Sequence, residues 1–143
     1  MPIAASISSE QNLQVGVSGP GDIASMYLVS GIANGVLNAF APSGGFNQQQ
    51  ATFSTHVGPV LTAAQFRKAI ASAAITSLSS SGGDSFNSWA VTEVDADFDD
   101  DAGRINLTFD LSVSVSAGAT GSSQSVVASV GFQVFILTTL PGE

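Results

Sequence analysis

Apolar and polar residues alternate along three stretches in the C-terminal half of the chain: Ala90–Phe98, Ile105–Val115 and Val126–Ile136. Side chains of a β-strand point to opposite faces in turn, so this alternation indicates strands that each bury one face. The predicted strands span about 88–98, 104–116 and 124–138.

The loops between these stretches suggest how the strands pair. Asp99–Gly103 suits a hairpin, because its glycine accepts a positive φ and its Asp side chains bond nearby N–H groups. Pairing Phe98 with Ile105 sets apolar residues opposite apolar residues, and pairing Val115 with Val126 does the same for the next two strands. A slip of one residue would turn an apolar set towards water, so the sequence predicts a three-stranded antiparallel meander.

The third stretch also carries apolar residues on its opposite face. Val127, Phe135 and Leu137 fall on the side that carries Ser129, whereas the other two strands have acidic and hydroxyl residues there. A strand that is apolar on both faces near its end is expected to be covered, here by the N-terminal segment or by another subunit. Gly131 indicates a bulge or a close backbone approach.

Two helices are predicted in the first half of the chain, at about 23–40 and 62–79. The first, one helix or two short ones, is an uncharged and mostly apolar stretch. The second follows Thr62-Ala-Ala-Gln65, which has the spacing of a capping box, and its apolar residues recur at helical spacing. This helix is expected to pack on the apolar face of the sheet.

Weak strand character at Leu13–Val17 adds a further edge strand, within the chain or on a neighbouring one. The predicted fold class is therefore α+β, with the meander packed against one or two helices. The 143 residues are expected to form a single domain, 1–143.

Charge is scarce and unevenly distributed. Charged residues make up 10% of the chain, against about 25% in an average protein. The net charge is −8, the three bases are Arg67, Lys68 and Arg104, and most of the acids cluster between Glu93 and Asp101. Nucleic-acid binding requires clustered cations, so it is excluded. The chain has no cysteine, which removes thiolate catalysis and Cys-ligated zinc.

The N-terminus is not expected to be a signal peptide, because it lacks a basic region followed by an apolar core. A membrane span over Ile23–Ala41 is also disfavoured. Asn34 and Asn38 dilute its apolar character, and no basic residue flanks it.

Nothing in the sequence predicts catalysis. His56 is the single histidine, and a nearby serine such as Ser54 has little weight in a chain rich in serine, so His56 is interpreted as structural or solvated. Paired carboxylates for glycoside hydrolysis would need an aromatic cleft, and the chain has one Trp and one Tyr. We expect no enzyme activity, no small-molecule substrate and no organic cofactor.

The acidic hairpin is the one candidate metal site. Asp95, Asp97, Asp99 and Asp101 offer the hard oxygen ligands that Ca²⁺ prefers. The spacing departs from a calcium-loop motif, because the glycine is displaced to Gly103 and no acid follows at the twelfth position. The alternatives are a solvated acidic tip or a tip that meets a basic neighbour.

The composition favours assembly. Charged residues are depleted at the centre of protein interfaces, so low charge with Ser, Gly and Ala in their place suits surfaces buried between copies. The predicted function is a non-enzymatic structural subunit of a large homo-oligomer, by analogy a phage or virus particle component such as a capsid-associated, neck or tail protein.

The expected partners are copies of the chain and other particle proteins, with contacts at Val127, Phe135 and Leu137, and the expected location is the virion. The alternative is a secreted or surface binding module, hence extracellular, with Ca²⁺ on the acidic hairpin.

Overall fold

A computed structural model of the chain describes residues 2–16, 25–34, 37–82 and 85–139. Over these residues the chain forms strands and turns and contains no helix, so the fold class is all-β. The strands are β1 Ile3–Ala4, β2 Ser6–Gly16, β3 Ser25–Asn34, β4 Leu37–Ala41, β5 Phe46–Val57, β6 Phe66–Ser81, β7 Phe86–Asp99, β8 Arg104–Ser116 and β9 Ser123–Thr138.

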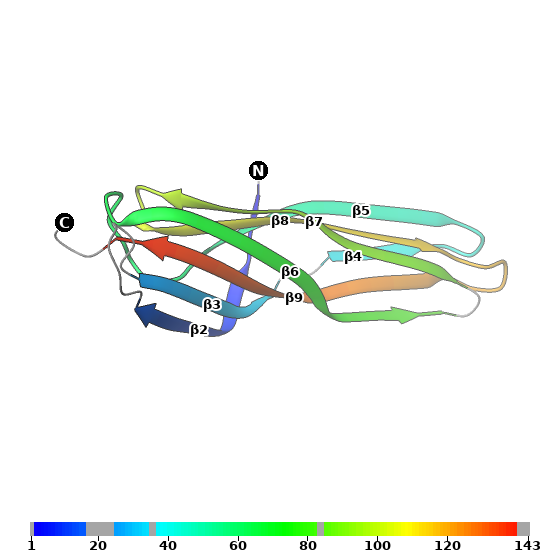
Figure 1. Ribbon diagram of the computed structural model, residues 1–143. Coiled ribbons are helices and arrows are strands. Elements are labelled where there is room, and N and C mark those ends of the chain that lie inside the picture. The colour runs from blue at the N-terminus through cyan, green and yellow to red at the C-terminus, as the bar shows by residue number, and fades with distance from the viewer. Residues whose placement is uncertain (1, 17–24, 35–36, 83–84, 140–143) are drawn as a thin grey trace.

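The strands form two sheets that pack face to face as a β-sandwich (Figure 1). Sheet A has the order β1-β5-β8-β7. In sheet B, β9 is central: β6 pairs along one side of it, β3 and β4 pair with successive halves of the other side, and β2 lies beyond β3. All pairs are antiparallel except β1 with β5.

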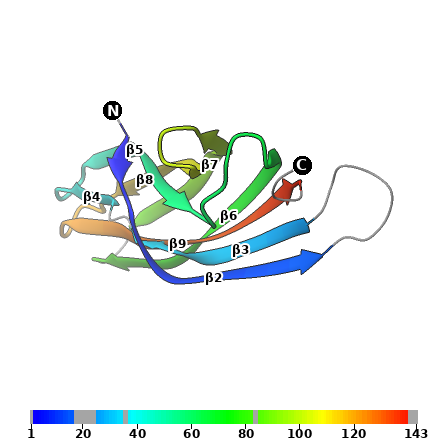
Figure 2. The same cartoon turned by 90° about the vertical axis from the view of Figure 1, so that its left-hand side faces the viewer.

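The N-terminal chain crosses from one sheet to the other. Figure 2 shows it passing from β1, beside β5, to the long curved β2 beside β3. A bulge interrupts β2 between Ser8 and Gln11, where Ser9 has a φ of 57°. The outer edge of sheet B is therefore formed by a segment that is anchored at its start in sheet A.

The core lies between the two inner faces. Every second residue of β8 from Ile105 to Val115 is buried, and β9 contributes a matching set that includes Phe132 and Ile136. Phe53 stacks on Phe109 with ring centroids 5.8 Å apart. Full burial of such a side chain stabilises the fold by about 1.5–3 kcal/mol.

The predicted helix at 23–40 is wrong: its described residues form β3 and β4. The residues buried in β3 are Ser25, Val29 and Ala33. Tyr27 and Gly31, which lie between them on the same face, are only half-buried, so the buried positions recur every four residues. A spacing of four fits both a helical face and one face of a strand. The pairing with β9 decides between the two.

The predicted helix at 62–79 is also wrong. The capping-box bonds do form, since the Thr62 N–H donates to Gln65 Oε1 (2.9 Å) and the Gln65 N–H donates to Thr62 Oγ1 (3.3 Å). They close a single turn, after which β6 begins at Phe66 and pairs with β9 over its length. That ladder overrides the helix propensity of the alanines in β6.

The predicted meander is correct only for its first hairpin. β7 and β8 pair with Phe98 opposite Ile105, as expected, until a bulge at Glu93 (φ 51°) shifts the register. The predicted pairing of Val115 with Val126 is wrong, because β8 lies between β5 and β7 whereas β9 belongs to sheet B. Two half-apolar strands bury their apolar faces equally well when they face each other across a sandwich.

The expected N-terminal edge strand corresponds to β2, although Val17 lies outside the described residues. Among the residues that the structure describes, no helix is long and apolar enough to cross a membrane.

Candidate interface on the outer face of sheet B

Two rows of apolar side chains cross the outer face of sheet B. Residues directly opposite one another on neighbouring strands share a face, so the pairing register defines each row. The first row consists of Leu13, Leu28, Phe135 and Ile70. The second consists of Val15, Met26 and Leu137 and ends at Lys68. We call these seven apolar residues the apolar rows.

The apolar rows face solvent in the single chain. Leu13 is 58% exposed, Ile70 55% and Phe135 41%, although each belongs to a residue type that is usually buried. Because the rows are adjacent and each crosses β2, β3 and β9, they form a continuous patch rather than scattered side chains. A contiguous apolar patch rimmed by polar residues is a common mark of a protein–protein contact site.

Two of the three predicted contact residues lie in this patch. Phe135 and Leu137 point outwards, as the alternation indicated. Val127 does not: it is completely buried, opposite Leu37, and belongs to the core. The alternation of β9 changes phase between Val127 and Val130, next to the register shifts around Ser77 of β6. This bulge puts Val127 on the opposite face from Phe135.

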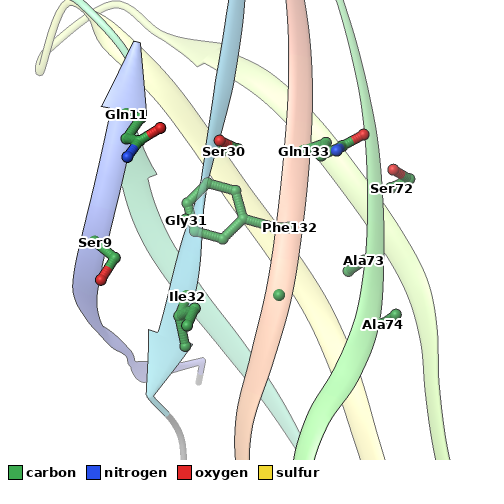
Figure 3. A pocket seen from close by; sticks show the side chains of 11 residues that line it. Ser9, Gln11, Ser30, Gly31, Ile32, Ser72, Ala73, Ala74, Phe132 and Gln133 are labelled. Carbon is green, nitrogen blue, oxygen red and sulfur yellow. The ribbon is translucent and has the colours of Figure 1, made fainter.

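A polar row lies beside the apolar rows. It consists of Gln11, Ser30, Gln133 and Ser72, one residue from each of the four strands (Figure 3). These residues line a shallow hollow of ≈ 630 Å³ that extends to Ser9, Ile32, Ala74 and Gly131. Serine, alanine and glycine residues in this lining project little from the sheet, which leaves the hollow.

The two glycines in this region allow close approaches. A Cβ on Gly31 would lie 2.9 Å from Phe132 Cζ, and one on Gly131 would lie 2.8 Å from Thr76 Cγ2. The ring of Phe132 therefore occupies the space that a side chain at Gly31 would need (Figure 3). The sequence prediction of a close approach at Gly131 is confirmed.

Three of the acidic side chains lie on the other outer face, that of sheet A. Lys68 is the one charged side chain in the three rows of sheet B defined above. The outer face of sheet A carries Asp95, Asp97 and Asp110 among hydroxyl and amide residues, and Thr52 donates a hydrogen bond to Asp110 (2.6 Å). Two copies that meet through sheet B thus keep their acidic faces apart, which limits their mutual repulsion.

One polar network ties β2 to sheet A. Glu10 Oε1 accepts the Gly58 N–H (3.0 Å) and lies 3.5 Å from Arg104 Nη2, while Arg104 Nε donates to the Gly58 carbonyl (2.9 Å). Gly58 has a φ of 82°, and a Cβ there would lie 3.0 Å from Ile136 Cδ1. Glu10 thus holds the bulge of β2 against the end of the sandwich.

The structure does not gather the four predicted calcium ligands. Asp95 and Asp97 lie two residues apart on the outer side of β7, and the negative charge and hydrogen bond of Asp95 raise the pKa of Asp97. Asp99 instead accepts N–H bonds from Asp101 (3.0 Å) and Ala102 within the turn. In the described residues no three Asp, Glu or His side chains come together as metal ligands.

His56 pairs with Asp99. Its Nε2 lies 2.8 Å from Asp99 Oδ2, and this bond, together with the backbone N–H of Ala102, lowers the pKa of Asp99. No serine hydroxyl in the described part of the chain hydrogen-bonds to His56, so the contact with Asp99 lacks the nucleophile of a catalytic triad. The bond between His56 and Asp99 connects the end of β5 to the end of β7, next to the β7–β8 turn.

The sequence reasoning missed Leu28 and Ile70, because both lay in segments predicted as helices. In β6, half-buried Ala69, Ala71 and Ala73 alternate with exposed neighbours, but this alternation is a property of the structure and not of the sequence. Alanine is apolar enough to fit either period, which concealed it.

Comparison with known proteins finds no matching family, and no curated protein or solved structure that matches this chain.

Proposed function

We propose that this protein is a non-enzymatic structural subunit of a large homo-oligomeric assembly, and that the apolar rows form a contact between subunits. The observation that carries the proposal is the exposure of Leu13, Phe135 and Ile70 in one row across sheet B. Removing such a patch from water stabilises an association by burying apolar surface.

The size of the patch suits the centre of an interface. Strands about 4.8 Å apart and same-face residues about 6.8 Å apart give the two apolar rows and the polar row together roughly 400 Å². A stable interface buries about 800 Å² on each partner, of which the centre is apolar and the rim polar. The serines and glutamines around the rows supply such a rim.

A phage or virus particle is the kind of assembly that we propose, as a capsid-associated, neck or tail component, with copies of the chain and other particle proteins as partners. The support is the low charge, the richness in Ser, Gly and Ala, and the segregation of acids away from the apolar rows. The particle itself is proposed by analogy with the composition of structural subunits as a class.

The test compares Phe135→Asp with Phe86→Asp, because Phe86 is an even more exposed phenylalanine (83%) on β7 of the other sheet. We expect wild type and Phe86→Asp to sediment as oligomers and Phe135→Asp as single chains. Circular dichroism checks that both variants keep their strands. A wild-type protein that sediments as a monomer, or equal assembly of both variants, would contradict the proposal.

The alternative function, a secreted or surface module that binds Ca²⁺, is supported by one observation. A side-chain hydrogen bond with Asp95 and the negative charge of Asp95 raise the pKa of Asp97, and a cation between the two carboxylates would offset that negative charge. Calcium titration, described below, separates this function from the first.

A further inference from the structure

The exposed edges of the two sheets are not equally protected against pairing with another chain. Natural sheets guard their edges with very short strands, charges or bulges. In sheet A, β7 carries Asp95, Asp97 and the bulge at Glu93. The two residues of β1 cover only Phe53 and Ser54 of β5, so the edge of β5 from Phe46 to Thr52 stays open in the described part of the chain, but its side chains from Asn47 to Gln50 are all amides. In sheet B, β6 carries Arg67 and Lys68 near its start and has three register shifts.

The edge strand β2 has none of these protections along its second half. From Gln11 to Gly16 it pairs with β3 without a register shift, and it contains no charge and no proline there. Its one acid, Glu10, is turned towards Gly58 and Arg104. No strand of the described chain pairs with its outer edge, which leaves alternate backbone N–H and C=O groups available to a partner.

The side chains of β2 point to the same conclusion. Every residue from Gln11 to Gly16 is exposed, so neither face of this half of the strand is buried by its own chain. Leu13 and Val15 are the first members of the two apolar rows, at the very edge of the sheet. Each row therefore stops at an open edge with an apolar side chain.

We propose that β2 pairs antiparallel with β2 of a second copy, across a twofold axis close to Leu13, so that the two B sheets form one continuous sheet. This inference rests on the proposed function and specifies one of its contacts. An antiparallel pair related by a twofold axis keeps both outer faces on the same side, so the apolar rows of the two copies become continuous.

A second copy fits this edge better than an unrelated peptide. Any extended peptide could satisfy the backbone groups, but a copy also brings Leu13 and Val15 next to their equivalents. The segment from Gln11 to Gly16 is uncharged, and Glu10 beside it lies 3.5 Å from Arg104 of its own chain. Pairing along this segment therefore brings no unpaired acid of one copy directly opposite an acid of the other.

The absence of cysteine from the chain allows a direct test. Single cysteines are placed in turn at Asn12, Leu13, Gln14 and Val15, and the protein is oxidised under mild conditions. Paired residues of an antiparallel ladder have Cα atoms about 4.5–5.5 Å apart, which is within reach of a disulfide. A residue two places from the axis lies about 14 Å from its symmetry mate, which is out of reach.

We expect the yield of disulfide-linked dimer to peak at one position and to fall about tenfold two residues away. Ser72→Cys is the matched control, because Ser72 is exposed in the same face of sheet B but lies on β6. Circular dichroism verifies the fold of each variant, and substitution of four separate exposed positions keeps the test independent of any one of them.

Two negative results have different meanings. If the wild-type protein is oligomeric but the β2 cysteines link no better than Ser72→Cys, or link equally at all four positions, the pairing of β2 is wrong and the proposed function stands. If the wild-type protein is a single chain in solution and none of the cysteines links, both the pairing and the proposed function fail.

Discussion

The central strands of the two sheets, β8 and β9, are alike on their inner faces and different on their outer faces. Both present alternate buried residues to the core, including Phe109 on β8 and Phe132 on β9. The outer face of β8 carries Asn106, Thr108 and Asp110, whereas that of β9 carries Phe135 and Leu137. The two strands thus share one core and differ in the chemistry of their outer faces.

The inner and outer faces of a strand are therefore subject to separate physical requirements. The inner face of each strand must be apolar, because the sandwich has no other core. The outer face of an antiparallel sheet is free to be polar when it meets water, as on β8, or apolar when a protein covers it. The apolar outer face of β9 is therefore the surface on which we propose a covering partner.

The greatest loss of stability is expected at Val127, which the bulge turns towards the core while Phe135 on the same strand faces outwards. Val127→Asp buries an unpaired charge and removes apolar burial, so it should cost about 5 kcal/mol or more and unfold most of the protein. The control is Val126→Asp, since Val126 is only half-buried and lies opposite exposed Asn38 and Ser79. Denaturant unfolding followed by circular dichroism measures both; a milder effect at Val127 than at Val126 would reverse the assignment of faces.

The second expected effect tests the inner face of β8. Phe109→Ala removes a fully buried ring that stacks on Phe53, and it should lower the free energy of unfolding by about 3–5 kcal/mol through lost burial and a cavity. Its neighbour Thr108 points outwards, and Thr108→Ala should change stability by no more than about 0.5 kcal/mol. Urea denaturation curves of the two variants give the comparison, and similar values for both would mean that β8 does not divide its faces in this way.

A smaller effect is expected in the titration of two aspartates on the acidic hairpin. The pKa of Asp99 should lie below its ordinary value of 3.8 because of the bond from His56, and the pKa of Asp97 above 3.8 because of Asp95. Carboxyl carbon shifts followed by NMR measure both. His56→Ala should raise the pKa of Asp99 towards 3.8, and Asp95→Asn should lower that of Asp97; shifts in the opposite sense would exclude these partners.

These pKa shifts also set the sign of the dependence of stability on pH. A lowered pKa favours folding above pH 3.8, and that contribution of Asp99 is lost as the pH falls through its folded pKa. A raised pKa favours folding below pH 3.8, and that contribution of Asp97 is lost as the pH rises through its folded pKa. Both groups are exposed, so solvent screens their effect on stability.

The smallest effect is expected from Ca²⁺. Because Asp95, Asp97, Asp99 and Asp101 do not come together as ligands, calorimetric titration should give no heat of specific binding up to about 10 mM Ca²⁺, well above the ~0.1–1 mM of weak extracellular sites. Saturable binding in the millimolar range that is lost in Asp97→Asn would instead favour the extracellular binding module.

Three features could be predicted from the sequence alone: the buried side chains of β8, the hairpin between β7 and β8 near Phe98, and the outward position of Phe135 and Leu137. Each of these follows from alternation within one strand or from a short loop, which are local properties. The proposed subunit contact at Phe135 and Leu137 was located on β9 from this alternation alone.

Only the tertiary structure decided that β9 leaves the meander for the second sheet, that β3 and β6 are strands, and that Val127 faces the core. Alternation says which face of a strand is buried but not which strand lies beside it, because an apolar face is satisfied equally by a neighbour in the sheet or across the sandwich. Pairings such as Leu28 with Phe135 and Phe135 with Ile70 join segments far apart in the chain, so the apolar rows exist only once the fold has brought four strands together.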